Sequence, residues 1–365
     1  MPFEQYYQSG NNKFSNLFRA LDSYKETGQF ISYHVDDNFI RSISGHKKPE
    51  DISTKTIIAL MKKGLKQLRK KHPKIRLALG GGTDSWTILK ICIKNNIYLD
   101  EVVCGLVSFS GNVRADLEYL PAIKYAKKYE GDKIGKVITL APTRESLTFV
   151  DDPQWFKKTG GPLLPIRPMI TQMGEQLMND TSSGYVTITG IDKPTVVVQK
   201  GKPYWTLMDV KSIGEWMGIK NHCPLFYDRD NPELTVAMTY SFMDNVKDMT
   251  NDGIYEYETI KDRKIKDQIL ESYGMRLDKP WLNHHFLGKE RFNFNIKTKY
   301  FLKECEQIGE GDFLNKWYDS ADGIIKNYKD IPNGIETDGK NVKAVGRFSK
   351  MIPILSEGFG YPDKS

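Results

Sequence analysis

The chain has 365 residues, of which 39% are hydrophobic and 27% charged, a composition that excludes the disordered and fibrous classes. Its formal net charge of +7 suits anionic substrates but is too small, in a chain of this length, to indicate a nucleic-acid groove. No apolar run approaches the roughly 18–20 residues of a membrane span, and the first residues lack a signal-peptide pattern. We therefore expect a cytoplasmic protein with no membrane partner.

The N-terminal part predicts a small cap followed by an amphipathic helix. Residues 1–52 mix polar and aromatic positions and are expected to form a cap or edge layer. From Ser53, apolar residues recur at helical spacing, lysines occupy the other faces, and Pro73 follows the end of the pattern. The lysines are interpreted as a solvated face.

An alternation of strands and helices follows. We predict strands at Ile75–Leu79, Val102–Phe109, Lys136–Leu140 and Tyr185–Thr189, and helices at Ser85–Asn95, Asp116–Tyr129 and Pro168–Met178. Strands separated by helices imply right-handed crossovers and an α/β fold with a doubly wound parallel sheet. Because such sheets bind ligands beyond the carboxyl ends of their strands, a site is expected in the turns after Leu79, Phe109, Leu140 and Thr189.

The pattern changes after Gly190. A hairpin is expected around Lys200-Gly201, where a soft domain boundary separates residues 53–200 from residues 201–365. The latter segment is expected to be a mostly helical substrate region, with helical periodicity from Pro232 to Tyr328 and a short strand pair in the tail. Asp230 and Glu233 are weak candidates for substrate contacts.

Four widely spaced cysteines, with no Cys-x-x-Cys among them, indicate neither a disulfide framework nor a zinc site. They are interpreted as reduced, mostly structural thiols. His222-Cys223 and the pair His284-His285 lack further ligands nearby in the sequence and are likewise interpreted as structural.

The turn after the first predicted parallel strand carries the clearest chemical signal, in "IRLALGGGTDSWTILK" from Ile75 to Lys90. Three glycines let the backbone adopt positive φ and bring its N–H groups close to a ligand. Amides opening onto a helix N-terminus favour an anion, and phosphate is the natural guest. A carboxylate beside a phosphate is repulsive unless Mg²⁺ lies between them, which gives Asp84 a specific role.

This turn resembles the Ser-Gly-Gly-x-Asp-Ser motif of the PP-loop, or N-type, ATP pyrophosphatases. Gly81, Gly82, Thr83, Asp84 and Ser85 match the motif, whereas Gly80 stands where the family usually has serine. The resemblance spans Ser53 to Lys193 and is greatest to the synthetase domain of asparagine synthetases. It implies an adenine nucleotide alpha-hydrolase-like, HUP-type fold that binds ATP and Mg²⁺ at Gly80–Ser85.

The same resemblance implies roles for two further segments. Asp192 and Lys193, after the strand that ends before Gly190, are similar in position to a second magnesium carboxylate and a pyrophosphate-binding lysine. Val107, Ser108 and Phe109 are expected to contact the adenosine. The basic loop Phe156–Pro168 is expected to act as a lid.

The leading hypothesis is an AMP- and pyrophosphate-forming ligase that adenylates a substrate carboxylate or carbonyl oxygen for displacement by a nitrogen nucleophile. Met1-Pro2 provides no glutaminase cysteine, so nitrogen is expected from ammonia, an amine or an ammonia-supplying subunit. Two alternatives stay open. One is a nucleobase-modifying enzyme, similar to 7-cyano-7-deazaguanine synthases or to enzymes that modify tRNA or DNA, and the other is an inactive nucleotide-binding module, favoured by Gly80. Nothing in the sequence supports nucleic acid over a small acceptor.

Overall fold

The computed structural model describes a discontinuous set of residues, and every structural statement below concerns this set. It comprises residues 5–14, 17–29, 31–35, 42–43, 46–106, 108–109, 119–155, 157, 184–190, 193–199, 202–207, 221–246, 253–255, 260, 262–275, 303–313, 315–316, 319–320, 323, 327, 336–338, 341–343 and 352–353. The predicted helix Pro168–Met178, the proposed lid except Lys157, and the pair His284-His285 lie outside it.

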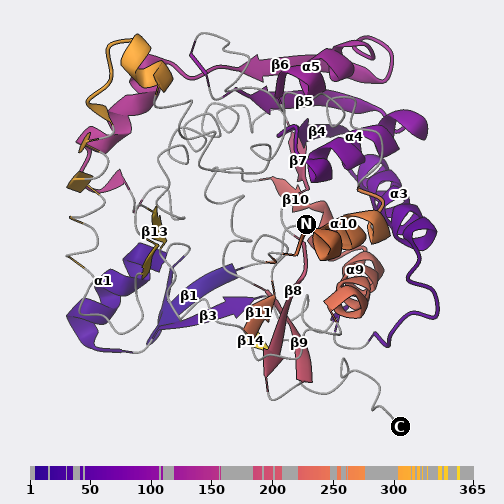
Figure 1. Cartoon of the computed structure of the whole chain (residues 1–365), viewed down its shortest axis with the longest axis horizontal. Helices are drawn as coiled ribbons and strands as arrows, with labels where there is room; N and C mark the ends of the chain where they lie inside the picture. The colour runs from indigo at the N-terminus through magenta and orange to yellow at the C-terminus, as the bar shows by residue number, and fades with distance from the viewer. Residues whose placement is uncertain are drawn as a thin grey trace.

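A five-stranded parallel sheet with flanking helices confirms the expected α/β fold (Figure 1). Its strands, in chain order, are β4 (Lys74–Ala78), β5 (Leu99–Gly105), β6 (Ile134–Leu140), β7 (Tyr185–Thr189) and β10 (His222–Pro224). The spatial order is β10-β7-β4-β5-β6. The chain therefore reverses its direction of travel across the sheet between β4 and β7, and such a switch point is where open parallel sheets bind ligands.

Three helices alternate with strands β4, β5 and β6 along the chain. They are α3 (Thr54–Lys71), α4 (Thr83–Lys94) and α5 (Tyr119–Lys127). The side chain of Ser53 caps α3 by accepting a hydrogen bond from the Thr56 N–H, and the apolar stripe of α3 is buried as its spacing predicts. The ring of Trp86 on α4 packs at a tilt of 59° against that of Tyr125 on α5, with ring centroids 4.5 Å apart. This packing fixes the two helices beside each other.

The strand bounds differ from the prediction mainly at β5, which spans Leu99–Gly105 rather than Val102–Phe109. Leu99 is aligned with Ile134, the first residue of β6, and Gly105 with Leu140, its last. The partner strand therefore determines where β5 begins and ends, because a strand stops where its neighbour offers no further backbone groups.

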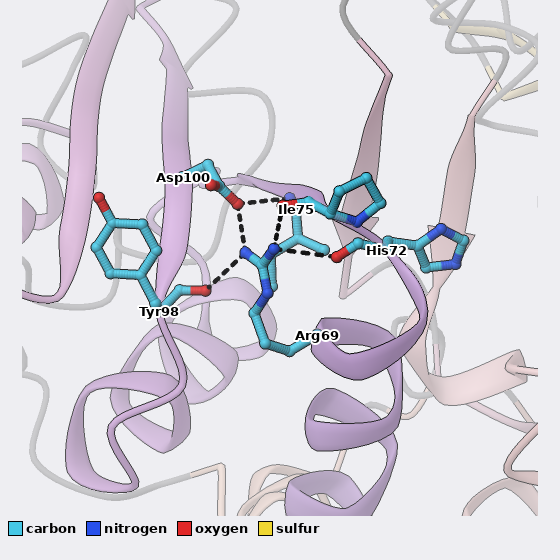
Figure 2. Close-up of polar contacts among 6 residues, drawn as sticks. Arg69, His72, Ile75, Tyr98 and Asp100 are labelled. Carbon is cyan, nitrogen blue, oxygen red and sulfur yellow. Dashed lines mark hydrogen bonds and ion pairs between the residues drawn. The ribbon is translucent and has the colours of Figure 1, made fainter.

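A cluster of polar contacts fixes the turn from α3 into β4 at the amino end of the sheet (Figure 2). The guanidinium of Arg69 forms an ion pair with Asp100 and donates to the backbone carbonyls of His72 and Pro73. Asp100 also accepts a hydrogen bond of 2.8 Å from the Ile75 N–H. Since both ends of the turn are tied to β5, the start of β4 is fixed, and with it the position of the loop at its other end.

The N-terminal segment forms a small antiparallel sheet in the order β2-β1-β3 with one helix. These elements are β1 (Gln5–Ser9), β2 (Asn12–Phe14), α1 (Leu17–Thr27) and β3 (Ile31–Val35). Tyr7, Phe18 and Leu21 are buried in the same hydrophobic cluster as Met61 of α3. The segment thus packs into the core that also supports the parallel sheet.

The hairpin expected around residues 200–201 is confirmed, with Gln199 of β8 (Thr195–Gln199) aligned with Lys202 of β9 (Lys202–Leu207). The four-stranded sheet to which it belongs has the order β11-β8-β9-β14, with β11 at Gly253–Tyr255 and β14 at Ile352–Pro353. The tail strand pair is also confirmed, as β12 (Glu336–Asp338) and β13 (Asn341–Lys343).

Residues beyond 200 contribute helices α9 (Pro232–Val246) and α10 (Arg263–Ser272), but they also supply strands to three sheets. One of them, β10, is an edge strand of the parallel sheet, so this sheet is not confined to residues 53–200. The 3-10 helix η4 (Leu225–Tyr227) is a single turn, and the 3-10 helix η1 (Arg144–Asp151) is longer. Within the described residues, no helix combines the length and apolar character needed to cross a bilayer.

Candidate functional site

The glycine loop follows β4 at the carboxyl edge of the sheet. The N–H of buried Leu79 donates to Val103 O at 2.7 Å, so the last sheet bond is made just before the loop. Gly81 has φ +69°, a left-handed conformation that glycine adopts without strain. A Cβ placed on Gly80 or Gly82 would meet no atom within 4 Å. The loop therefore has open space above its first and third glycines.

Helix α4 begins directly after this loop without a side-chain cap. Gly82 is its N-cap and has no side chain to accept the first-turn N–H groups. By contrast, α3 is capped by Ser53 and α10 by Asp262. The first N–H groups of a helix need partners and carry partial positive charge, so an uncapped N-terminus beside open space suits an anion.

The amide of the first glycine has a partner inside the loop. The Gly80 N–H donates to Ser85 Oγ at 3.2 Å, and Ser85 is buried in the first turn of α4. The amide of Gly80 is therefore engaged within the loop in this conformation. Ser85 thus stabilises the loop by accepting this hydrogen bond.

Asp84 and Lys193 meet across the switch point. The Lys193 ammonium lies 2.9 Å from each carboxylate oxygen of Asp84 and donates a hydrogen bond to Oδ2. The Lys193 side chain is 3% exposed and that of Asp84 is 23% exposed. Among the described residues, no group donates a well-aligned hydrogen bond to Asp84 Oδ1, which is itself buried. The expected convergence of the loops after β4 and β7 is thus observed for these two residues.

Gly190 explains how the loops come so close. A Cβ on Gly190 would lie 3.0 Å from the backbone carbon and Cβ of Asp84 and from Ile88 Cδ1. Any larger residue at the end of β7 would push α4 away. Gly190 therefore sets the distance between the first turn of α4 and the segment that carries Lys193.

The donor set around Asp84 fits Mg²⁺ held together with phosphate. Among the described residues, no group of three or more His, Cys, Asp and Glu side chains is placed to hold a metal ion by itself. Mg²⁺ commonly uses one or two carboxylates and completes its coordination with phosphate oxygens and water. Asp84, with one carboxylate oxygen that accepts no well-aligned hydrogen bond from the described residues next to the uncapped helix, meets this requirement. Asp192, the expected second carboxylate, lies outside the described residues.

The residues predicted to contact adenosine are not brought to Asp84 by any described contact. Val107 lies outside the described residues, and Ser108 is fully buried. Phe109 packs with Leu140 against a small cluster formed by Leu147, Cys305 and Phe313. Phe109 therefore links the end of β5 to η1 and to a segment near residue 305.

Sequence reasoning missed a buried pair next to the site. Thr189, the last residue of β7, forms a 2.5 Å hydrogen bond through Oγ1 with His222 Nε2 on β10. Burial lowers the pKa of His222 to about 4, so the ring is neutral at neutral pH. The sequence did contain a signal for buried polar contacts in this strand. A parallel strand buried on both faces favours apolar residues, yet two of its positions are Thr187 and Thr189, and both are buried.

Asp230 and Glu233 are used in helix packing. Asp230 pairs with Lys71, and Glu233 lies 2.6 Å from Lys63, both at the side of α3 that faces α9. All four cysteines are free and buried, as expected for structural thiols. Burial raises the pKa of Cys92 and of Cys305 to about 12 and raises that of Cys223 as well, which leaves them protonated.

No protein-family model matches this chain, and no curated protein matches it either.

Proposed function

We propose that the protein is an ATP-dependent, AMP- and pyrophosphate-forming enzyme of the PP-loop type with a HUP-type sheet. One observation carries the proposal: the uncapped N-terminus of α4, the carboxylate of Asp84 and the buried ammonium of Lys193 meet at the switch point of a parallel sheet. A helix N-terminus and a buried cation attract a polyphosphate, while a single carboxylate suits its divalent metal.

The roles follow from position. The backbone N–H groups at Gly82 and Thr83 would bind phosphate oxygens, and Asp84 would hold Mg²⁺, which supplies charge neutralisation when bound. Lys193 would stabilise the negative charge that develops as pyrophosphate leaves. The chain's own part is to align the triphosphate and to neutralise its charge, with no covalent protein intermediate.

The motif favours adenylation over transfer of the terminal phosphate. No lysine follows the three glycines, as it would in the Gly-x-x-x-x-Gly-Lys-Ser/Thr loop of many phosphate-transferring ATPases. The cation near the loop comes instead from the segment after β7, a hundred residues later in the sequence. We propose a carboxylate or carbonyl oxygen as the adenylated group and a nitrogen nucleophile as the second substrate. A nucleobase acceptor is the alternative within the same chemistry.

A second candidate, a nucleotide-binding module without catalysis, is favoured by two observations. Gly80 replaces the usual serine and its amide is bonded to Ser85, which removes one donor from the phosphate cradle. Loss of one hydrogen bond to a charged phosphate costs about 1.5–3 kcal/mol. Such a loss weakens binding without abolishing it, so we place this candidate second.

Incubation with ATP labelled at the α-phosphorus, Mg²⁺ and a panel of amines and carboxylic acids tests the proposal. We expect labelled AMP and unlabelled pyrophosphate, and loss of both in Asp84→Asn. Formation of ADP and phosphate would contradict the chemistry. Binding of ATP without any turnover on the full panel would favour the inactive module, and turnover that requires RNA or DNA would favour the nucleobase-modifying branch.

A further inference from the structure

Positive charge is concentrated on three neighbouring helices. Residues 53–140 contain 17 Lys and Arg but only 7 Asp and Glu, so this part has a net charge of +10, whereas the rest of the chain has −3. Helices α3, α4 and α5 lie in this part, and each packs on a strand of the parallel sheet. Since α4 lies beside α3 (Figure 1) and also contacts α5, the three helices form one layer on one face of the sheet.

The outer side of this layer carries lysines that have no acidic partner. Six of its exposed lysines form no ion pair with any described residue. They are Lys66 and Lys70 on α3, Lys94 on α4, and Lys124, Lys127 and Lys128 on α5 or just after it. We call these six residues the lysine surface.

The acidic residues of the same part are mostly engaged in other contacts. Asp84, Asp100 and Glu101 each form an ion pair with a lysine or an arginine outside the lysine surface. Glu130 accepts a hydrogen bond of 2.7 Å from a backbone N–H of β6. Among the described acidic residues of this part, only Asp132 is left without such a contact. The described chain therefore does not neutralise the lysine surface, and an external anion can do so.

The scarcity of apolar groups narrows the class of that anion. Among the described residues, Tyr98 is the only large hydrophobic side chain that is exposed, at 43%. A helix that lies on a membrane needs apolar residues on its outer side, and protein interfaces are centred on apolar or aromatic anchors and are depleted in lysine. Single-stranded nucleic acid is bound by stacking of its bases on exposed aromatic rings. Duplex nucleic acid, by contrast, is bound through its phosphates by charge alone.

We infer that the lysine surface docks double-stranded nucleic acid through its phosphate backbone, without reading the base sequence. The six lysines lie in the second halves of α3 and α4 and at the end of α5, where each helix leads toward the amino end of the next strand. The glycine loop lies at the opposite edge of the sheet. The inference therefore does not depend on the proposed ATP chemistry, and it does not make the nucleic acid the acceptor.

Fluorescence anisotropy with a short labelled DNA duplex of arbitrary sequence tests this inference on the full chain. Wild-type protein should bind the duplex with a dissociation constant of about 1–100 μM near physiological salt, as sequence-independent binding does. The logarithm of the affinity should fall linearly with the logarithm of the salt concentration, by about 0.9 for each phosphate neutralised. The combined variant Lys66→Gln, Lys70→Gln, Lys94→Gln should reduce this slope by about 2–3 and weaken binding at least about tenfold.

A second combined variant removes the same charge from elsewhere. Lys25→Gln, Lys48→Gln, Lys316→Gln replaces three exposed lysines outside the layer, which contact Asn327, Asp244 and Asp151. This control should leave the affinity and the salt slope nearly unchanged. Because lysines in the last turn of a helix also complement its dipole, the helix content of both variants is compared by circular dichroism. Charge reversal at Lys66 alone, which lies outside the last turn of α3, repeats the test should the first variant lose helix content.

Three results would overturn the inference. One is the absence of duplex binding by the wild-type protein, with or without binding to phosphatidylserine vesicles. Another is an equal loss of affinity in both combined variants, because net charge and not the lysine surface would then be responsible. The third is tighter binding to either single strand than to the duplex. Loss of duplex binding in the first variant alone, with helix content retained, would support the inference.

Discussion

Gly190 and Asp84 lie in contact across the switch point, where a methyl group on Gly190 would be 3.0 Å from Asp84 Cβ. This contact joins the end of β7 to the first turn of α4, and it brings Lys193 within 2.9 Å of the Asp84 carboxylate. The site is thus formed by the packing of two strand ends rather than by the glycine loop alone.

Gly190→Ala should lower both the free energy of unfolding and the affinity for magnesium pyrophosphate. The added methyl would displace Asp84 and Ile88, at a cost of about 1–3 kcal/mol for an overpacked position. Because the displaced residue is part of the proposed site, affinity for magnesium pyrophosphate should fall at least about tenfold, as positioning errors near 1 Å are costly. Gly323→Ala, at a helical position where a Cβ meets no atom within 4 Å, is the control and should leave affinity unchanged without lowering stability. Unchanged affinity in Gly190→Ala would show that the contact does not position the site.

A second close contact involves Gly64 in the middle of α3, where helix propensity would disfavour glycine. A Cβ there would lie 2.7 Å from Nδ2 of Asn231, which is buried and donates to Leu60 O at 3.0 Å. Although alanine is favoured in helices by about 1 kcal/mol over glycine, we expect Gly64→Ala to lower the free energy of unfolding by about 1–2 kcal/mol because Asn231 must move.

A double-mutant cycle checks this explanation. In the Asn231→Ala background the obstructing amide is absent, so Gly64→Ala should become neutral or stabilising in urea unfolding. An equal loss of stability in both backgrounds would show that the clash with Asn231 is not the cause.

Much of the fold could be predicted because its signals are local. The helix at Thr54–Lys71 and the strands at Lys74–Ala78 and Tyr185–Thr189 have strong periodicity or apolar runs, and their bounds lie within a residue or so of the prediction. The bounds of β5 were less predictable, because they depend on where β6 begins and ends. The three-residue strand β10 has too short a pattern to be assigned to the parallel sheet from sequence.

At the site too, features within one segment could be predicted from the sequence, whereas contacts between distant segments could not. The glycine loop is contiguous, and the approach of Lys193 follows from the rule that parallel strands end at one edge. Contacts such as Thr189 with His222 and Gly64 with Asn231 join residues 33 and more than 160 positions apart, and no pattern in either segment specifies the partner. The bond from Gly80 to Ser85 was missed because a loop conformation, and not residue type, decides which amides are used.

Because His222 is buried, we expect the free energy of unfolding to fall in mild acid. Burial lowers its folded-state pKa from the ordinary 6.5 to about 4, so the folded protein binds fewer protons than the unfolded chain between these values. This contribution to stability is present above about pH 6.5 and is lost as pH falls toward 4, on the order of 3 kcal/mol in total. Urea unfolding at steps from pH 7.5 to 4.5 should show this decline, and His222→Gln should show a shallower one. A decline of equal steepness in the variant would assign the acid sensitivity to other groups.

A buried ion pair across the sheet provides the last prediction. Arg76 of β4 donates to Glu101 of β5 through Nε at 2.7 Å, and its Nη2 lies 2.7 Å from the same carboxylate oxygen. Their side chains are only 4% and 11% exposed, so neutralising Glu101 leaves the buried Arg76 guanidinium without its carboxylate partner. Glu101→Gln should therefore lower the free energy of unfolding by about 3 kcal/mol or more, measured by urea denaturation.

Replacing both members should cost far less than replacing one. The double variant Arg76→Met, Glu101→Leu removes both charges and keeps apolar volume, and buried pairs replaced in this way are often neutral in stability. The Arg69–Asp100 pair at the amino end of the sheet is more exposed, at 25% and 23%, so Asp100→Asn should be milder than Glu101→Gln. If the double variant at Arg76 and Glu101 were as unstable as the single one, the loss would come from their contacts with Tyr185 on β7, and not from unpaired charge.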